Sequence, residues 1–242
     1  MGAVTASDVG IEFSINRKQK RSARDTILKG RRIRSSQRFW ALRHVSFHVE
    51  AGESVGLIGA NGSGKTTLLK IVGGVMAPDE GSLTVGGQVA SMLSLGAGFS
   101  PGLTAKENIY MTSAIYGLSR KEIEERFDEV VEYAGIGEFI DTPLRHFSSG
   151  MRVRLGFSLI REIDAPIVLL DEVLAVGDRA FSKKARGHVE SMKDEGKTLF
   201  IVSHQAKNLK KLCNRILVLN KGKLIHDGDV AEGLDKYQNL KG

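Results

Sequence analysis

Short blocks of Val, Ile, Leu and Phe alternate along the chain with segments in which apolar residues recur every three or four positions. The blocks predict strands at 9–15, 45–49, 54–58, 167–170, 198–202, 216–219 and 223–226. The recurring pattern predicts helices at 65–75, 106–116, 120–134, 151–163, 183–193 and 206–212. Wholly apolar blocks suit strands that are covered on both faces, so we expect an α/β protein with a mainly parallel sheet.

The segment 97–165 has a mostly helical pattern and no convincing strand. We therefore expect a helical part inserted into an α/β core, with residues 1–242 forming a single domain. Near the end of the chain, Asp229 can cap a short helix in which Val230, Leu234 and Tyr237 share one face. This last helix is expected to complete the domain.

Composition narrows the class of protein. Hydrophobic residues make up 41% of the chain and charged residues 26%, which is enough apolar material for a packed core. The single cysteine, Cys213, excludes an internal disulfide framework and fits a reducing compartment. The apolar runs are shorter than the ~20 residues that span a bilayer, and residues 1–8 contain no signal-peptide core. We therefore expect a cytoplasmic protein.

One glycine-rich segment carries a specific chemical signal. Between the predicted strand 54–58 and the helix that follows, the sequence matches the phosphate-binding pattern G-x-x-x-x-G-K-[ST] with Gly59, Ala60, Asn61, Gly62, Ser63, Gly64, Lys65 and Thr66. Glycines let successive N–H groups converge on a triphosphate, and the positive end of the helix adds to the attraction. Lys65 would face the β- and γ-phosphates, the Thr66 hydroxyl would bind Mg²⁺, and Thr67 completes the expected nucleotide-binding set.

Three polar residues that end predicted strands suit hydrolysis at such a site. Asp171 follows the strand 167–170 and can hold Mg²⁺, and Glu172 can act as the general base that polarises the attacking water. His204 follows the strand 198–202, which we expect beside the strand of Asp171, where it can contact the γ-phosphate and water. The alternatives are two solvated acids at a strand end and a structural histidine.

Ser148, Ser149 and Gly150 precede a predicted helix and form either an ordinary helix cap or a second anion site. The order of the motifs resembles ABC-type ATPases, in which a Walker A loop, a signature sequence, a Walker B strand and a histidine follow one another. The usual signature is Leu-Ser-Gly-Gly-Gln, and residues 147–151 depart from it at three of five positions while keeping Ser148 and Gly150. The resemblance implies a RecA-like P-loop core with an antiparallel β subdomain and a helical insertion. It also implies that the signature faces the nucleotide of a second, identical subunit.

Further segments narrow the resemblance to a subfamily. The stretches 39–42, 95–99, 107–110, 148–151 and 172–178 look like those of ATPases from polysaccharide exporters. That group moves lipid-linked O-antigen, capsule, teichoic acid or galactan across the bacterial inner membrane. The resemblance implies an ATP- and Mg²⁺-dependent ATPase homodimer on the cytoplasmic face of that membrane. Its partner would be a separate transmembrane permease dimer that passes the lipid-linked polysaccharide, and no nucleic acid is expected.

The resemblance also suggests roles for single residues. Phe13 matches the aromatic residue that stacks on adenine, with Trp40 as a second candidate and core packing as the alternative for Phe13. Asp178 would end the loop that contacts the partner subunit. The glutamine that usually contributes to the metal site is absent, and Ser94 is its equivalent here. Exporters that recognise a sugar cap carry an extra carbohydrate-binding domain after the ATPase; we expect none here and assign substrate selection to the membrane partner.

The net charge of +7 is concentrated in one place, because residues 17–38 contain ten Lys or Arg and a single acid, Asp25. This basic insertion, about 16–38, can lie near anionic lipid or a lipid-pyrophosphate head group, can be a solvated loop, or can bind nucleic acid. It contains no aromatic residue that would stack on bases, which disfavours nucleic acid.

Two rival functions use the same phosphate-binding loop. A soluble ABC ATPase acting on nucleic acid is disfavoured because no second phosphate-binding loop and no long coiled-coil insertion occurs. A P-loop kinase or GTPase would leave residues 148–150 and His204 without a role.

Overall fold

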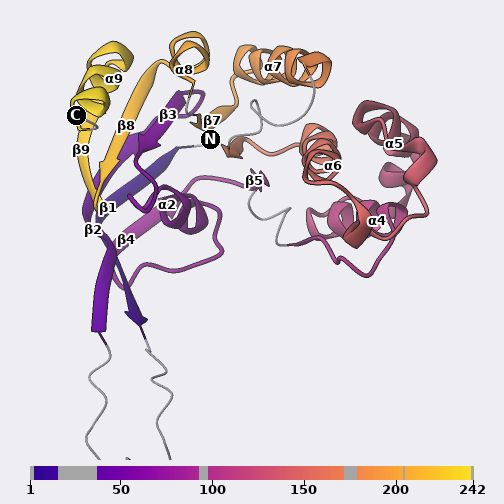
Figure 1. Ribbon diagram of the computed structural model, residues 1–242, viewed down its shortest axis with the longest axis horizontal. Coiled ribbons are helices and arrows are strands. Elements are labelled where there is room, and N and C mark those ends of the chain that lie inside the picture. Colours follow the sequence, from indigo (N-terminus) through magenta and orange to yellow (C-terminus); the bar gives the residue numbers. More distant parts are fainter. Residues whose placement is uncertain (1–2, 16–36, 93–97, 172–178, 204, 241–242) are drawn as a thin grey trace, which may run out of the picture.

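The computed structural model describes residues 3–15, 37–92, 98–171, 179–203 and 205–240, and the structural statements below concern these residues (Figure 1). Their strands form two sheets. The smaller, antiparallel sheet has the order β2-β1-β4, with β1 at Val4–Ile15, β2 at Gln37–Val49 and β4 at Glu80–Val85. The larger sheet contains, in spatial order, β5 (Val89–Ser91), β6 (Ile167–Asp171), β7 (Thr198–Val202), β3 (Ser54–Gly59), β8 (Arg215–Asn220) and β9 (Lys223–Gly228).

Neighbouring strands of the larger sheet are parallel except for the pair β8 and β9. The α-helices are α2 (Lys65–Val72), α4 (Ala105–Ile115), α5 (Arg120–Ala134), α6 (Ser149–Glu162), α7 (Arg179–Asp194), α8 (Ala206–Leu212) and α9 (Val230–Asn239). Two short 3₁₀ helices, Gly137–Phe139 and Leu144–His146, connect α5 to α6. These elements confirm the expected α/β class.

Two strands have no counterpart among those predicted from the pattern. Every residue of β4 is exposed or only partly buried, and the strand pairs with β1 alone, so it carries no apolar block. The strand β5 has three residues at the edge of the larger sheet. The pattern detects strands as runs of apolar residues, so it misses β4, which has no buried residue, and β5, whose three residues are too few to form a run.

One hydrophobic cluster joins the two sheets through α2, which lies between them in Figure 1. Leu68, Leu69, Ile71 and Val72 of α2 are buried in it. The ring of Phe47, from β2, meets that of Phe200, from β7, edge to face at a centroid distance of 6.3 Å. The helix that follows the phosphate-binding loop is therefore held rigidly between the sheets.

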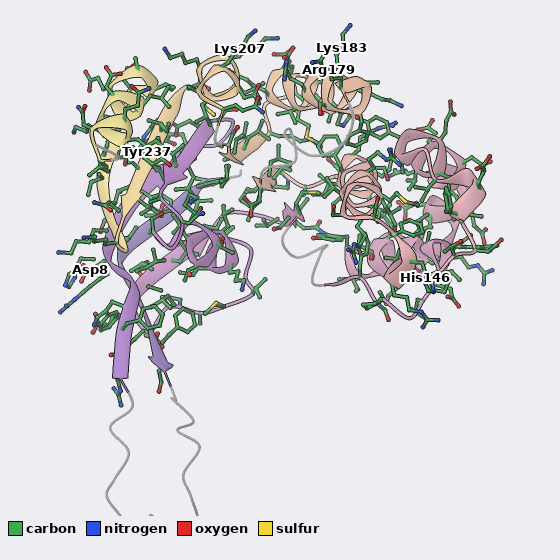
Figure 2. The ribbon with its side chains drawn as sticks, in the orientation of Figure 1. Asp8, His146, Arg179, Lys183, Lys207 and Tyr237 are labelled. Carbon is green, nitrogen blue, oxygen red and sulfur yellow. The ribbon has the colours of Figure 1, made fainter. Side chains whose placement is uncertain are left out.

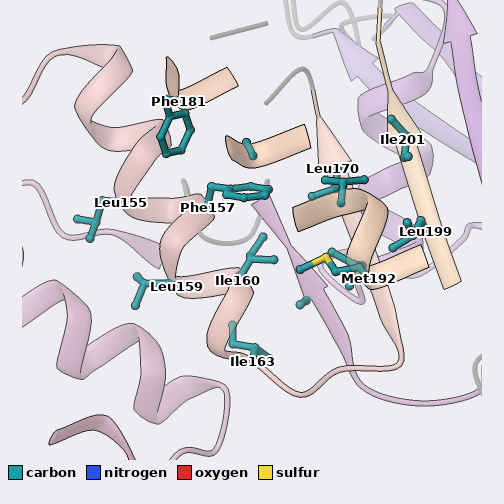
Figure 3. Close-up of a cluster of buried hydrophobic side chains, with 14 of the residues drawn as sticks. Leu155, Phe157, Leu159, Ile160, Ile163, Leu170, Phe181, Met192, Leu199 and Ile201 are labelled. Carbon is teal, nitrogen blue, oxygen red and sulfur yellow. The ribbon is translucent and has the colours of Figure 1, made fainter. Parts of the chain in front are cut away.

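A second cluster covers the opposite side of the larger sheet and extends into the helical part (Figure 3). Phe157 and Ile160 of α6 pack with Phe181 of α7, and Leu170 and Ile201 bring in two neighbouring strands. The helices α4 to α6, which lie together in Figure 1, thus share a continuous core with the sheet. None of the described helices combines the length and the apolar character that a membrane crossing needs.

The second cluster contains the cysteine, Cys213, and this gives a pH-dependent prediction. Its side chain is 7% exposed, and burial raises the pKa of the thiol from about 9 to about 12. An unfolded thiol loses its proton above pH 9 while the folded one keeps it, so stability is lost as the pH rises from 9 towards 12. Between pH 9 and 10.5 we expect the unfolding free energy to fall by about 1.5 kcal/mol more than in a Cys213→Ala variant.

Urea denaturation at pH 8, 9, 10 and 10.5 measures this difference. The Cys213→Ala variant keeps every other alkaline titration, so the comparison isolates the thiol. Equal losses in the two proteins would mean that Cys213 ionises as readily in the folded state as in the unfolded chain.

Candidate nucleotide-binding site

The phosphate-binding loop joins the end of β3 to the start of α2, as the sequence predicts. Gly64, the residue before the helix, has a φ of 109°, and a Cβ there would lie 2.7 Å from the Ala41 carbonyl oxygen. Only glycine fits this position because both the backbone angle and the space exclude a side chain. The amide of Leu68 donates to the Gly64 carbonyl at 2.9 Å, so the amides of residues 65–67 precede the first backbone hydrogen bond of the helix.

The first turn of α2 contains no acidic residue, and its cap makes no side-chain hydrogen bond. The helices α4 and α5 differ, since Thr104 and Ser119 cap them and pair with Glu107 and Glu122 of their first turns. Hydrogen bonds from the capping residues hold the pKa of both carboxyls below its usual range, so each helix end keeps its own anion. In α2 the positive end of the helix is left for an anion from outside the chain.

The Lys65 side chain bends back over the loop. Its ammonium donates to the carbonyl oxygens of Gly59, at 2.7 Å, and Ala60, at 3.1 Å. These contacts hold a full positive charge at the N-terminal end of α2. A lysine in this place suits the β- and γ-phosphates of a nucleotide.

An open cavity of about 850 Å³ lies against the loop, which is large enough for a nucleotide. Residues of the loop and of α2 form its polar end: Asn61, Gly62, Gly64, Lys65, Thr66 and Thr67. Its remaining lining comes from Phe13, Phe39, Trp40, Ala41, Asp171 and Lys221. The cavity therefore combines a phosphate-binding end with an aromatic wall.

The aromatic wall comes from the pairing of β1 with β2. Phe13 lies opposite Phe39 in the register, and the ring centroids are 5.8 Å apart with the planes inclined by 31°. Phe39 is 46% exposed, so its ring offers a free face. Trp40 follows it, with the Arg43 guanidinium 5.3 Å from the ring centroid. The structure thus places both aromatic candidates at the cavity and adds Phe39, which sequence reasoning did not single out as a site residue.

The metal-binding candidates Thr66 and Asp171 line the same cavity from different elements. Asp171 ends β6 and pairs with Val202 of β7, and β7 pairs in turn with β3, which leads into the loop. This order confirms that the strand of Asp171 is the neighbour of the strand before His204. A hydroxyl, a carboxylate and phosphate oxygens are hard oxygen ligands, so the residues present fit Mg²⁺ bound together with a nucleotide.

Some predicted residues lie elsewhere or outside the described part of the chain. Gly59, Ala60 and Ser63 do not line the cavity; the Ser63 side chain is 3% exposed, and its hydroxyl has no hydrogen-bond partner among the described residues. The carbonyls of Gly59 and Ala60 instead hold Lys65. Four further predictions concern residues outside the described ranges: Ser94, Glu172, Asp178 and His204.

The segment 148–150 forms the start of α6, which begins at Ser149 rather than at the predicted residue 151. Ser148 caps the helix, its hydroxyl accepting from the Met151 amide at 3.2 Å, and the first turn contains no acid. The helix begins two residues earlier than predicted because the Ser148 hydroxyl accepts from an amide of the first turn that would otherwise lack a partner. None of Ser148, Ser149 and Gly150 lines the cavity, and Figure 1 shows α6 in the helical part, away from α2.

The helix α9 also reaches the phosphate-binding loop. Figure 2 shows Tyr237 on this helix beside the strands of the larger sheet, while Arg179, Lys183 and Lys207 point outward from α7 and α8. The Tyr237 hydroxyl lies 3.5 Å from the Gly59 carbonyl oxygen, one of the two acceptors of Lys65. The last helix of the fold therefore abuts the end of β3, where the loop begins.

Comparisons with known proteins agree with this geometry. A family profile described as "ABC transporter" matches residues 42–175. The chain is 43% identical over 212 residues to the O-antigen export system ATP-binding protein RfbB of Klebsiella pneumoniae, which covers 88% of this chain and 84% of that protein. It is 36% identical over 238 residues to the teichoic acids export ATP-binding protein TagH of Staphylococcus haemolyticus (strain JCSC1435), covering 98% of this chain and 89% of that protein.

Among solved structures, the post-hydrolysis dimer of the ATP-binding cassette MJ0796 bound to ADP and Pi is similar, with a TM-score of 0.75 and 20% identity. The match covers 94% of this chain and 98% of that one. At this identity the likeness concerns the fold alone, and it confirms the expected arrangement of a P-loop core with an antiparallel sheet and a helical part.

Proposed function

Because the chain belongs to the ABC transporter family, we propose that it is the ATP-binding and ATP-hydrolysing subunit of a transporter that exports a lipid-linked polysaccharide across a bacterial inner membrane. The observation that carries the ATPase part is the cavity in which Lys65, Thr66 and Asp171 meet beside an aromatic wall. The relatives named for O-antigen and teichoic acid export support the class of substrate.

Each part of the cavity has a role in this proposal. The Lys65 ammonium and the amides at the start of α2 bind the β- and γ-phosphates, and Phe13 stacks on adenine. Thr66 and Asp171 hold Mg²⁺, which neutralises phosphate charge when bound, and Ser94 is assigned to the same metal site. We assign activation of the attacking water to Glu172 and the γ-phosphate contact to His204, since they follow Asp171 and β7 in the chain.

The second anion site, Ser148 to Gly150, acts on another copy of the chain. Its helix start lacks an acid and does not line the cavity of its own chain, so a phosphate that reaches it comes from another subunit. Two chains would enclose two nucleotides, with Asp178 at the subunit contact. The dimer would act on a transmembrane permease dimer at the cytoplasmic face of the membrane.

Organisation of the chain follows from the same proposal. Residues 1–242 act as one ATP-binding domain, in which the helical part 97–165 carries the second anion site. The basic insertion 16–38 would lie near the anionic lipid or lipid-pyrophosphate head group at the entrance of the permease. The relatives named for export leave the nucleic-acid alternative without support.

Nucleotide-dependent dimerisation tests the proposal. A Glu172→Gln variant binds ATP without hydrolysing it, so it should form a dimer with ATP and Mg²⁺ and stay monomeric without nucleotide. Adding Ser148→Ala should weaken that dimer at least tenfold, because the second anion site is lost. Light scattering coupled to size-exclusion chromatography measures the dimer fraction of each variant with and without ATP and Mg²⁺.

Ser119 offers a matched control. It caps α5, also in the helical part, and like Ser148 its hydroxyl accepts an amide of the first turn. Ser119→Ala in the Glu172→Gln background therefore removes a helix cap but no proposed ligand contact, and the dimer should persist. Equal weakening by both serine substitutions would contradict the role of Ser148. Co-purification with a permease and labelled lipid-linked glycan tests the substrate class separately.

A further inference from the structure

The turn between β8 and β9 has an unusual residue at its first central position. Lys221 and Gly222 have φ values of 47° and 78°, so both lie in the left-handed region. Hairpin turns of this kind favour Asn, Asp or Gly first, because other side chains are strained there. The backbone geometry of the turn therefore does not favour a lysine here, so the reason for this residue lies in the surroundings of its side chain.

The backbone of the turn is fixed against the phosphate-binding loop. The Gly222 amide donates to the Ser63 carbonyl oxygen at 3.0 Å, and the Gly222 carbonyl accepts from the Arg43 amide at 2.8 Å. A Cβ on Gly222 would lie 2.8 Å from the Ala41 carbonyl oxygen, so the turn sits close against β2 as well. The base of the Lys221 side chain is thus held between the loop and the strand that carries the aromatic wall.

Lys221 lines the nucleotide cavity together with Lys65, and among the described residues that line it these two carry the cationic side chains. They enter from different directions. Lys65 belongs to the first turn of α2, whereas the turn of Lys221 adjoins Ala41 and Ser63, between the aromatic wall and the loop. With the base against the aromatic wall and the β- and γ-phosphates at Lys65, as proposed above, the turn of Lys221 falls between the two.

We propose that Lys221 is a second phosphate-binding cation, whose ammonium pairs with the α-phosphate of the nucleotide. The inference rests on the proposed function, since it assigns a further residue to the same cavity. It explains why a strained turn position carries a long cationic side chain. Because the partner is the phosphate nearest the ribose, ATP, ADP and AMP all make the contact, and adenosine does not.

The test compares two lysines of the same hairpin. Lys223 is exposed like Lys221 but does not line the cavity, so Lys221→Met and Lys223→Met remove the same charge at different places. Calorimetric titration with MgATP and MgADP, and competition by AMP and by adenosine, give the affinities. We expect Lys221→Met to lower the affinities for ATP, ADP and AMP each about three- to tenfold, while the affinity for adenosine stays unchanged and Lys223→Met binds like the wild type. Raising the salt concentration should reduce the difference in affinity between the wild type and Lys221→Met, because screening weakens the interaction between Lys221 and the phosphate.

A further variant separates binding from folding. Lys221→Gly relaxes the left-handed backbone, so its melting temperature should equal or exceed that of the wild type while its nucleotide affinity falls as in Lys221→Met. The inference is overturned if Lys221→Met lowers the affinity for adenosine as much as that for AMP, or if it lowers the affinity for ATP alone. It is also overturned if Lys221→Met and Lys223→Met bind the nucleotides equally well. A wild-type protein that binds no ATP would instead overturn the proposed function itself.

Discussion

A Lys65→Met variant should lose at least 99% of its ATP hydrolysis while remaining as stable as the wild type. The lost ammonium is the positive charge at the phosphate end of the cavity, held 2.7 Å from the Gly59 carbonyl oxygen and 3.1 Å from that of Ala60. Removing one preorganised donor from a developing negative charge lowers the rate by about 10²- to 10³-fold. Phosphate release at saturating MgATP measures the loss.

Stability should change far less than activity. Lys65 occupies the first residue of α2, where a cation opposes the helix dipole, but its removal also loses two hydrogen bonds to the carbonyls of Gly59 and Ala60, so the opposing effects should leave the melting temperature close to that of the wild type. Lys70, in the last turn of the same helix, is the matched control. Lys70→Met should keep full activity and lose a few tenths of a kcal/mol of stability. A Lys65→Met protein that retains a tenth of the wild-type rate would contradict the assignment of Lys65 to the phosphates.

The second large effect is on folding, where Gly233→Ala in α9 should cost about 2–3 kcal/mol of unfolding free energy. A Cβ on Gly233 would lie 2.1 Å from Cγ2 of Ile216 and 2.7 Å from Cδ2 of His226. Ile216 is completely buried and His226 is 8% exposed, so neither side chain can move into free space. The helix must therefore shift away from β8, or the core must be strained.

A glycine-to-alanine substitution in another helix should instead stabilise the protein. Gly187 lies within α7, and a Cβ there meets nothing within 4 Å. Gly187→Ala should raise the unfolding free energy by up to about 1 kcal/mol, because alanine favours the helix more than glycine does. Urea denaturation of the two variants beside the wild type measures both effects. If both substitutions stabilise the protein, the close contact between α9 and β8 is absent in solution.

The phosphate-binding end of the site was predictable from the sequence because it is local. A buried strand, a glycine loop and the start of a helix are consecutive in the chain, and backbone geometry alone brings residues 61, 62 and 64–67 to one end of the cavity. The adjacency of β6 and β7 was also predictable, since buried parallel strands end at one edge of a sheet. The helix caps at Ser148 and Asp229 were predictable for the same reason, because each side-chain oxygen accepts hydrogen bonds from amides no more than three residues away.

The remaining wall of the cavity depends on contacts between distant segments. Phe39 becomes a site residue because it pairs with Phe13, and that register depends on β1 and β2 meeting across the segment 16–36, whose length hides the pairing. Lys221 reaches the cavity because the Gly222 amide binds Ser63. No periodicity in the sequence encodes either approach, since both are set by how the sheets pack.

The sequence by itself determined the fold class, the loop between β3 and α2, and the position of Asp171 at the end of a buried strand. Each of these depends on hydrogen bonding and burial over a few consecutive residues, so the types and spacing of those residues are enough to predict it. Only the tertiary structure decided which aromatic rings and which second lysine complete the cavity, and which helical glycine, Gly233 rather than Gly187, cannot be replaced. Those outcomes depend on close packing between elements far apart in the chain: an added Cβ would lie 2.1 Å from its nearest neighbour at Gly233 and would meet nothing within 4 Å at Gly187.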